Sequence, residues 1–291
     1  MFAKTKAALT ASALFAGLAA GFAAPASATH SWAGMHWART TTLTLRLGDN
    51  VTPAWDPYLV SAAADWNKSI PIDTLIYAGT RAPSTCTPTY GKIEVCNAAY
   101  GVNGWLGLAN VWTQNGLIVQ GTVKLNESYF ASASYNTPAW RRMVMCQEIG
   151  HTFGLDHQDV IQTNVNLGSC MDYSRDPSGL KGTNGTKNNE HPNAHDFDQL
   201  NTSYARNDGT QLSTTKASGS NIFANNLFDG TQVSVGGRAF AGAASLNPRE
   251  WGRPVALDNR GRARAFKRSL GDGVEVTTFV TWVDGHEDDN H

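Results

Sequence analysis

The stretch that decides the fold of this chain is CQEIGHTFGLDHQ, residues 146–158. A Thr-Pro pair at residues 137–138 begins the run AWRRMVMCQEIGHTFG, which predicts one long helix that ends at Gly154. Glycine suits the exit of a helix because it adopts the left-handed backbone conformation that residues with a β-carbon avoid. The spacing therefore indicates a helix whose chain turns back at Gly154 and returns His157 toward the last helical turn.

Three side chains of this stretch are predicted to face one metal ion. Residues four apart on a helix lie on one face, so Gln147 and His151 point in the same direction, and His157 joins them from the turn. Three protein ligands and an open fourth position are the arrangement of a catalytic zinc. Glu148 follows the first ligand and is the predicted general base, since zinc lowers the pKa of its water to about 7. The alternative is that the two histidines are ordinary polar residues on a helix and its exit.

The run EIGHTFGLDH resembles the metzincin metalloproteases, which include the matrixins and astacins. Their second hallmark is a methionine turn below the zinc, and GSCMDY supplies Met171 fourteen residues after His157. Astacin-like and serralysin-like members carry a tyrosine two residues after that methionine, which approaches the zinc and steadies the oxyanion, and Tyr173 occupies that place. The resemblance covers residues 40–206 and implies a zinc endopeptidase that acts on peptide or protein substrates.

Hydrophobic patterning predicts an α+β fold. Strands are expected at residues 41–49 and 72–79 and in GKIEVC, LGLANVWT and LIVQGTVKLN, and helices after Thr52-Pro53, Thr137-Pro138 and Asn193. This order matches the metzincins, which implies a twisted mixed sheet, an active-site helix, a methionine turn and a C-terminal helix. LGLANVWT would then be the edge strand that a bound peptide extends as an additional antiparallel strand, with an ordinary core strand as the alternative.

The sequence departs from the metzincin pattern at Gln147, where the family has histidine. Glutamine offers a neutral amide oxygen, which is a poorer zinc donor than imidazole. Three interpretations follow: Gln147 ligates zinc, another residue completes the set, or the protein is a catalytically inactive metal-binding or interaction protein. The residues considered for the second interpretation are Asp156, His191 and His195. We favour a working zinc hydrolase, because the other positions of the pattern are intact, namely Glu148, His151, Gly154, His157, Met171 and Tyr173.

The chain is predicted to have three parts. Residues 1–28 have the features of a secretory signal, with two lysines before the apolar run AALTASALFAGLAAGFAA and an Ala-Ser-Ala cleavage site, so the protein is expected to be secreted. Residues 29–206 form the predicted catalytic domain. Residues 207–291 form a linker and a small β-rich region with strands near GRPVALD, RARAFKRSL and GVEVTTFVTWV. The formal charge of −1 gives no basic footprint for nucleic acid, and no further segment is apolar enough to predict a membrane partner.

Four cysteines allow three disulfide pairings in an exported protein. We favour Cys86–Cys96, which closes a local loop, and Cys146–Cys170. In the metzincin resemblance the second bridge would join the active-site helix to the methionine turn, because Cys146 precedes Gln147 and Cys170 precedes Met171. Zinc ligation by the thiols is the competing interpretation, although no C-x-x-C pair is present. Residues 159–192 form an Asn- and Asp-rich loop that leaves a calcium site as a further possibility, without EF-hand spacing.

Overall fold

The computed structural model describes residue 1 and residues 29–38, 43–205 and 245–284. The predicted secretory signal lies outside the described residues, apart from Met1. The chain has the α+β class that the sequence predicts, with a twisted mixed sheet and few helices. None of the described helices combines the length and the apolar character needed to cross a bilayer.

Most elements begin and end within a few residues of their predicted positions. The strands are β1 (His36–Trp37), β2 (Leu43–Asn50), β3 (Ile72–Ala78), β4 (Ile93–Ala98), β5 (Trp105–Gln114), β6 (Leu117–Asn126), β7 (Arg253–Leu257), β8 (Ala263–Gly271) and β9 (Val274–Trp282). The α-helices are α1 (Asp56–Trp66), α2 (Glu127–Phe130), α3 (Pro138–His151) and α4 (Ala194–Tyr204), and a 3-10 turn covers Pro248–Glu250. Residues 159–192 contain no helix and no named strand, as their Asn- and Gly-rich composition predicts.

One sheet contains all the described strands, in the order β3-β2-β4-β6-β5-β9-β8-β7, with β1 paired to β6. Strands β2, β3, β4 and β6 pair in parallel, and β5 pairs antiparallel with β6. The C-terminal strands continue this sheet, because β9 pairs antiparallel with β5 from Trp105↔Trp282 to Gln114↔Val274. The C-terminal strands that the sequence indicates are therefore present, and they are built into the main sheet.

This pairing decides between the two interpretations of LGLANVWT. In the structure β5 lies between β6 and β9, and both sides of its backbone are paired, so it is a core strand and not a free edge. The sequence of β5 left the choice open because it shows that the segment is a strand but not which later segment pairs with it.

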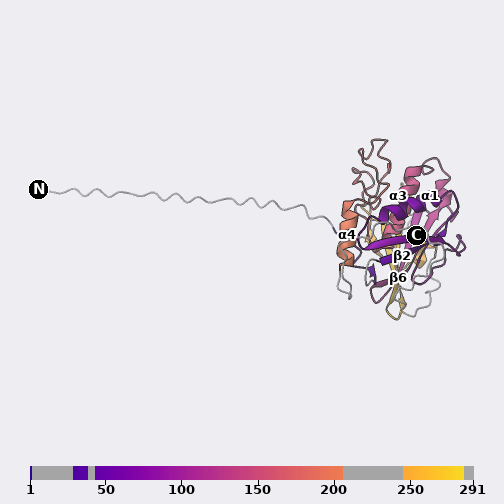
Figure 1. Cartoon of the computed structure of the whole chain (residues 1–291). Coiled ribbons are helices and arrows are strands. Elements are labelled where there is room, and N and C mark those ends of the chain that lie inside the picture. Colours follow the sequence, from indigo (N-terminus) through magenta and orange to yellow (C-terminus); the bar gives the residue numbers. More distant parts are fainter. Residues whose placement is uncertain (2–28, 39–42, 206–244, 285–291) are drawn as a thin grey trace.

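Helices α1 and α3 lie together over one face of the sheet and enclose the main core (Figure 1). The indole of Trp66 at the end of α1 donates to the Cys146 carbonyl of α3 at 3.1 Å. Beneath α3, a β-carbon built on Gly150 would lie 2.5 Å from the Met171 sulfur and 2.7 Å from the Trp66 ring. Glycine at position 150 thus lets the residue 171 turn pack directly under the helix.

Two disulfides join the cysteines in the predicted pairs, Cys86–Cys96 and Cys146–Cys170. No cysteine is free among the described residues. The second bridge links α3 to the turn that carries Met171, so the floor of the candidate site is covalently tied to its helix. Zinc ligation by these thiols is therefore ruled out as an interpretation.

Candidate metal centre and peptide cleft

Helix α3 presents the candidate residues at its C-terminal end. The Thr137 hydroxyl caps its start by accepting from the Trp140 N–H at 3.3 Å, and Pro138 occupies the first turn. Past the end of α3, Gly154 has a φ of 92°, and a β-carbon there would lie 2.0 Å from the Met35 carbonyl oxygen. The predicted turn is therefore confirmed, and only glycine fits it because the described N-terminal segment crosses it at this point.

The turn brings the two predicted histidine ligands together. The Nε2 atoms of His151 and His157 are 3.2 Å apart, and both side chains are buried. The Nδ1 of His151 is bonded to the Leu155 carbonyl oxygen at 2.9 Å, and the Nδ1 of His157 lies 3.4 Å from Oδ1 of Asp156. Burial holds the pKa of His151 well below its ordinary value and lowers the pKa of His157 to about 4. Both rings are therefore neutral at pH 7 and can bind a cation through nitrogen.

Glu148 lies beside this pair in a fully buried position. Burial raises the pKa of Glu148 to about 8, and a hydrogen bond from Thr281 opposes that rise. Oε1 accepts from the Thr281 hydroxyl at 2.5 Å, whereas Oε2 is buried without a hydrogen-bond partner among the described residues. Strand β5 passes close to the carboxyl group, since a β-carbon on Gly107 would lie 2.5 Å from Oε1. A nearby cation would favour the ionised form of this carboxyl, which is the form that a general base requires.

Gln147 is also fully buried, and the fold fixes the orientation of its amide. Its Nε2 donates to the Cys170 carbonyl oxygen at 2.9 Å, and its Oε1 accepts from the Thr281 hydroxyl. The carbonyl of Cys170 can only accept, so the amide nitrogen must face the methionine turn and the amide oxygen must face the Glu148 side. The amide oxygen, the only atom of this side chain that could bind a cation, therefore faces Glu148 and Thr281.

Met171 and Tyr173 lie close to α3 and to His157, respectively. Met171 is buried under α3, and Tyr173 packs edge-on against His157 with ring centroids 4.4 Å apart. The Tyr173 hydroxyl donates to the Val280 carbonyl oxygen on β9 at 3.1 Å. The phenol thus binds a peptide carbonyl directly beside the histidine pair.

The site contains residues that the sequence did not single out. Arg264 on β8 forms a two-pronged ion pair with Asp156, including Nη2–Oδ2 at 3.0 Å, and its Nη1 lies 3.1 Å from Nδ1 of His157. Phe279 on β9 stacks on the His151 ring at 4.4 Å with an interplanar angle of 4°. These residues and Thr281 come from the β-rich C-terminal region, more than a hundred positions after α3, and no local signal in the sequence links them to it.

The alternative ligands are occupied elsewhere. Asp156 is held by Arg264, and His191 is bonded to Asp65 at 2.5 Å. His195 stacks on His30 at a centroid distance of 4.9 Å. Within the described ranges, no three His, Cys, Asp or Glu side chains form a group that could hold a metal ion. Among the residues singled out from the sequence, Gln147 is therefore the remaining candidate for a third ligand.

The donor set fits a zinc ion on two observations. Zinc–nitrogen bonds are about 2.0–2.1 Å long, so two nitrogens at tetrahedral positions are about 3.3 Å apart, close to the 3.2 Å between the two Nε2 atoms. Metal-bound histidines hold a carbonyl or a carboxylate with their other nitrogen. The Nδ1 of His151 has such a partner in the Leu155 carbonyl, and the Nδ1 of His157 lies between the Asp156 carboxylate at 3.4 Å and the Arg264 guanidinium at 3.1 Å. The calcium alternative in residues 159–192 receives no support, because Asp159 and Asp176 are bonded within the loop.

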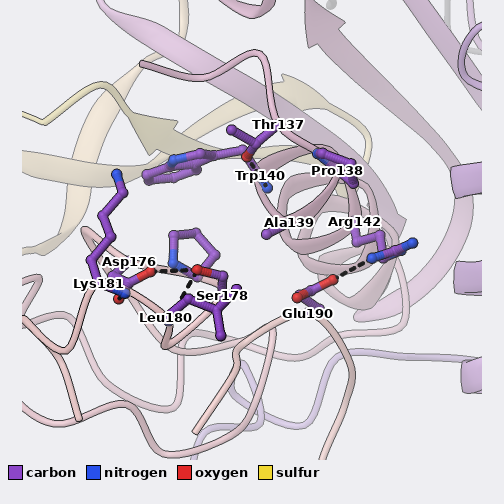
Figure 2. Close-up of a pocket in the computed structure, with 11 residues that line it drawn as sticks. Thr137, Pro138, Ala139, Trp140, Arg142, Asp176, Ser178, Leu180, Lys181 and Glu190 are labelled. Carbon is purple, nitrogen blue, oxygen red and sulfur yellow. Dashed lines mark hydrogen bonds and ion pairs between the residues drawn. The ribbon is translucent and has the colours of Figure 1, made fainter. Parts of the chain in front are cut away.

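A pocket of ≈ 340 Å³ opens between the start of α3 and the loop that follows Tyr173. Figure 2 shows Trp140, Thr137 and Pro138 on one side and Asp176, Ser178, Leu180 and Lys181 on the other, with the Arg142–Glu190 ion pair of 2.6 Å beside them. The end of β9 reaches this region, since Asp284 accepts from Arg175 at 2.7 Å and its N–H donates to the Tyr135 hydroxyl at 3.1 Å.

No family model matches the chain, and no curated protein matches it. Two solved structures are similar to it at low identity. One is high choriolytic enzyme 1, a hatching enzyme zinc-protease from the medaka fish Oryzias latipes, with a TM-score of 0.32, 13% identity, and coverage of 58% of this chain and 94% of that one. The other is myroilysin, with a TM-score of 0.31, 13% identity, and coverage of 59% of this chain and 83% of that one.

Proposed function

We propose that this protein is a secreted zinc-dependent endopeptidase with Gln147, His151 and His157 as metal ligands and Glu148 as general base. The observation that carries the proposal is the buried pair of Nε2 atoms, 3.2 Å apart, next to a buried carboxyl group and beside strand β5, which pairs with β9. Two disulfides agree with an extracellular location. The proposal implies peptide or protein substrates.

Each residue has a distinct part in the hydrolysis. Bound zinc would acidify a water molecule and polarise the substrate carbonyl. Glu148 takes the proton from that water and passes it to the leaving amine, so that the peptide C–N bond breaks, the new carboxylic acid gains the hydroxyl and the amine gains the proton. Tyr173 donates its hydroxyl hydrogen to the carbonyl oxygen as negative charge develops there, as it now does to the carbonyl of Val280.

The methionine turn and the disulfide hold these groups in place. Cys170 accepts from the amide of Gln147, and its disulfide to Cys146 anchors the neighbouring residue of α3. Buried hydrogen bonds such as the one from Gln147 to Cys170 fix the orientation of a metal-binding side chain. We assign a substrate side chain beyond the cleavage point to the pocket at the start of α3, because Asp284, two residues after β9, contacts Tyr135 and Arg175, which adjoin the pocket lining in sequence.

A non-catalytic interpretation is favoured by one observation, namely that both polar atoms of the Gln147 amide already have protein partners. In that case the chain would keep the architecture but hold no zinc at this site. The two interpretations differ in metal content.

The test is zinc stoichiometry together with peptide cleavage, measured for wild type and Glu148→Ala. Because β9 covers β5, each protein is assayed as the intact chain and as an opened chain. The opened chain carries a specific-protease recognition sequence inserted between residues 208 and 235, which is cut after folding. We expect one zinc per chain in both proteins and cleavage only with Glu148 present, with a loss of about 10²–10⁴-fold in Glu148→Ala. Loss of zinc in Glu148→Ala would show that this residue is a ligand, and absence of zinc from wild type would favour the non-catalytic interpretation.

A further inference from the structure

We infer that strand β9 occupies the place of a peptide substrate beside β5 and so keeps the intact chain inactive. The sequence of β9 then indicates which peptides bind to β5 when β9 is displaced, in what is called here the freed cleft. This inference rests on the proposed function, because it assigns a substrate class and a form of control to the same site. Four observations on described residues carry it.

The first observation is the backbone pairing. Extended peptides bind many proteins by adding a strand to an exposed sheet edge, where main-chain hydrogen bonds supply affinity. Strand β9 adds itself to β5 in this manner over nearly its whole length, from Val274 to Trp282. Since β6 occupies the other side of β5, no further strand can pair with β5 while β9 is in place.

The second observation is the position of one peptide bond. The carbonyl of Val280 accepts from the Tyr173 hydroxyl at 3.1 Å, and the hydroxyl of the next residue, Thr281, donates to Oε1 of Glu148 at 2.5 Å. The proposed oxyanion donor and the proposed base thus contact the two residues on either side of one amide bond. The Val280–Thr281 bond lies where the scissile bond of a substrate would lie.

The third observation explains why this bond persists in the folded chain. The Thr281 hydroxyl bridges Oε1 of Glu148 and Oε1 of Gln147, so its oxygen lies between the proposed base and the proposed first ligand. The Phe279 ring covers the flat face of His151. A residue that fills this point opposes the entry of the water that hydrolysis needs, so β9 binds as an inhibitor.

The fourth observation is the side-chain pattern that β9 presents. Phe279 precedes the analogue of the cleaved residue and packs against both His151 and Trp32, the latter edge-on at 5.1 Å. Downstream, the carboxylate of Asp284 pairs with Arg175 at 2.7 Å. The freed cleft is therefore expected to select extended, β-branched peptides with an aromatic residue one position before the cleaved carbonyl residue and an acidic residue four positions after it.

The test uses the opened chain and a fluorescein-labelled peptide TTFVTWVD, which copies residues 277–284. Fluorescence anisotropy measures binding to the intact chain and, at high dilution, to the opened chain, and a peptide of the same composition in scrambled order is the control. We expect the opened chain to bind the labelled peptide at least tenfold more tightly than the intact chain does, and the scrambled peptide at least tenfold more weakly than TTFVTWVD. Equal binding by the two forms, or equal binding of the two peptides, would overturn the inference.

A point-variant arm keeps the test decisive if the opened chain fails to stay folded. Thr281→Ala removes the hydroxyl between Glu148 and Gln147. Thr277→Ala is the matched control, because Thr277 is a buried threonine on the same strand that forms no hydrogen bond with Glu148 or Gln147. We expect labelled-peptide binding to the uncut chain to rise several-fold in Thr281→Ala relative to Thr277→Ala. Identical binding in the two variants, with their folds intact by circular dichroism, would contradict the substrate-like docking of β9.

Peptide binding needs no hydrolysis, so the two proposals fail separately. An opened chain that binds TTFVTWVD selectively but holds no zinc and cleaves nothing would overturn the proposed function and leave the strand analogue standing. An intact chain that cleaves peptides as fast as the opened chain does, without competition from TTFVTWVD, would overturn the strand analogue and leave the endopeptidase standing. If both hold, TTFVTWVD should inhibit the cleavage of other peptides by the opened chain and remain uncut itself, because it carries the same threonine as β9.

Discussion

Replacing Phe279 by alanine should destabilise the whole domain, although this residue lies in the β-rich C-terminal region. The side chain is fully buried in the main core, stacks on His151 and meets Trp32 edge-on. An aromatic side chain buries about 150–250 Å², which corresponds to about 4–6 kcal/mol at about 25 cal/mol per Å². Alanine retains part of that burial, so we expect a loss of about 3–5 kcal/mol in the free energy of unfolding.

The measurement is urea denaturation followed by tryptophan fluorescence. With an m value of about 2 kcal/mol per molar urea, a loss of about 4 kcal/mol lowers the midpoint by about 2 M. Leu257→Ala is the matched control, because Leu257 lies on β7 of the same region but is 55% exposed, and its change should stay within about 0.5 kcal/mol.

A small effect of Phe279→Ala would refute the reasoning. If the C-terminal strands were an appendage docked away from α3, the substitution would cost less than about 1 kcal/mol and the two variants would unfold alike.

Two further predictions concern groups around the site and at its flank. Tyr173→Phe removes the donor to the Val280 carbonyl and should lower the unfolding free energy by about 1–3 kcal/mol in chemical denaturation. The same substitution should reduce cleavage by the opened chain about 10²-fold or more. Unchanged cleavage would remove Tyr173 from the mechanism. The hydrogen bond that His191 donates to Asp65 raises the pKa of His191 above its ordinary 6.5. Burial raises the pKa of Asp65, but the hydrogen bonds from His191 and Lys68 outweigh burial and hold that pKa below 3.8. The stabilisation that comes from the raised pKa of His191 is complete below pH 6.5 and is lost as the pH rises through the folded pKa of His191. The stabilisation that comes from the lowered pKa of Asp65 is lost only as the pH falls below 3.8. His191→Asn should therefore cost most between about pH 4 and 6.5, by at most about 1 kcal/mol because the imidazole is partly exposed, and a pH-independent difference between the two stability curves would contradict this pair.

The helix and the turn of the candidate site could be predicted because their signals are local. Thr137 and Pro138 start α3, Gly154 ends it with a backbone conformation that few other residues adopt, and the ligand spacing follows from the helical period. The Cys146–Cys170 bridge followed from the resemblance, which places the methionine turn under the helix. The sequence also indicated each C-terminal strand through its alternating apolar pattern.

The partner of β9 could not be predicted from the sequence. An alternating run such as VEVTTFVTW shows which residues share a face, but the choice of neighbouring strand depends on contacts more than 150 positions apart in the chain. The placement of Phe279, Thr281 and Arg264 at the candidate site depends entirely on that choice. For this reason the sequence predicted a cluster around the end of α3 but not the segment that covers it.

The zinc affinity of three proteins tests the central claim most directly: wild type, Gln147→His and Gln147→Ala, each titrated against a chelator. If the Gln147 oxygen is the third ligand, wild type binds one zinc, Gln147→His binds it more tightly because imidazole is the better donor, and Gln147→Ala loses at least about tenfold in affinity because only two protein ligands remain. Equal zinc retention in wild type and Gln147→Ala would show that another residue completes the site. Zinc bound by Gln147→His alone would contradict the claim, because the natural chain would then hold the architecture of the site without its metal.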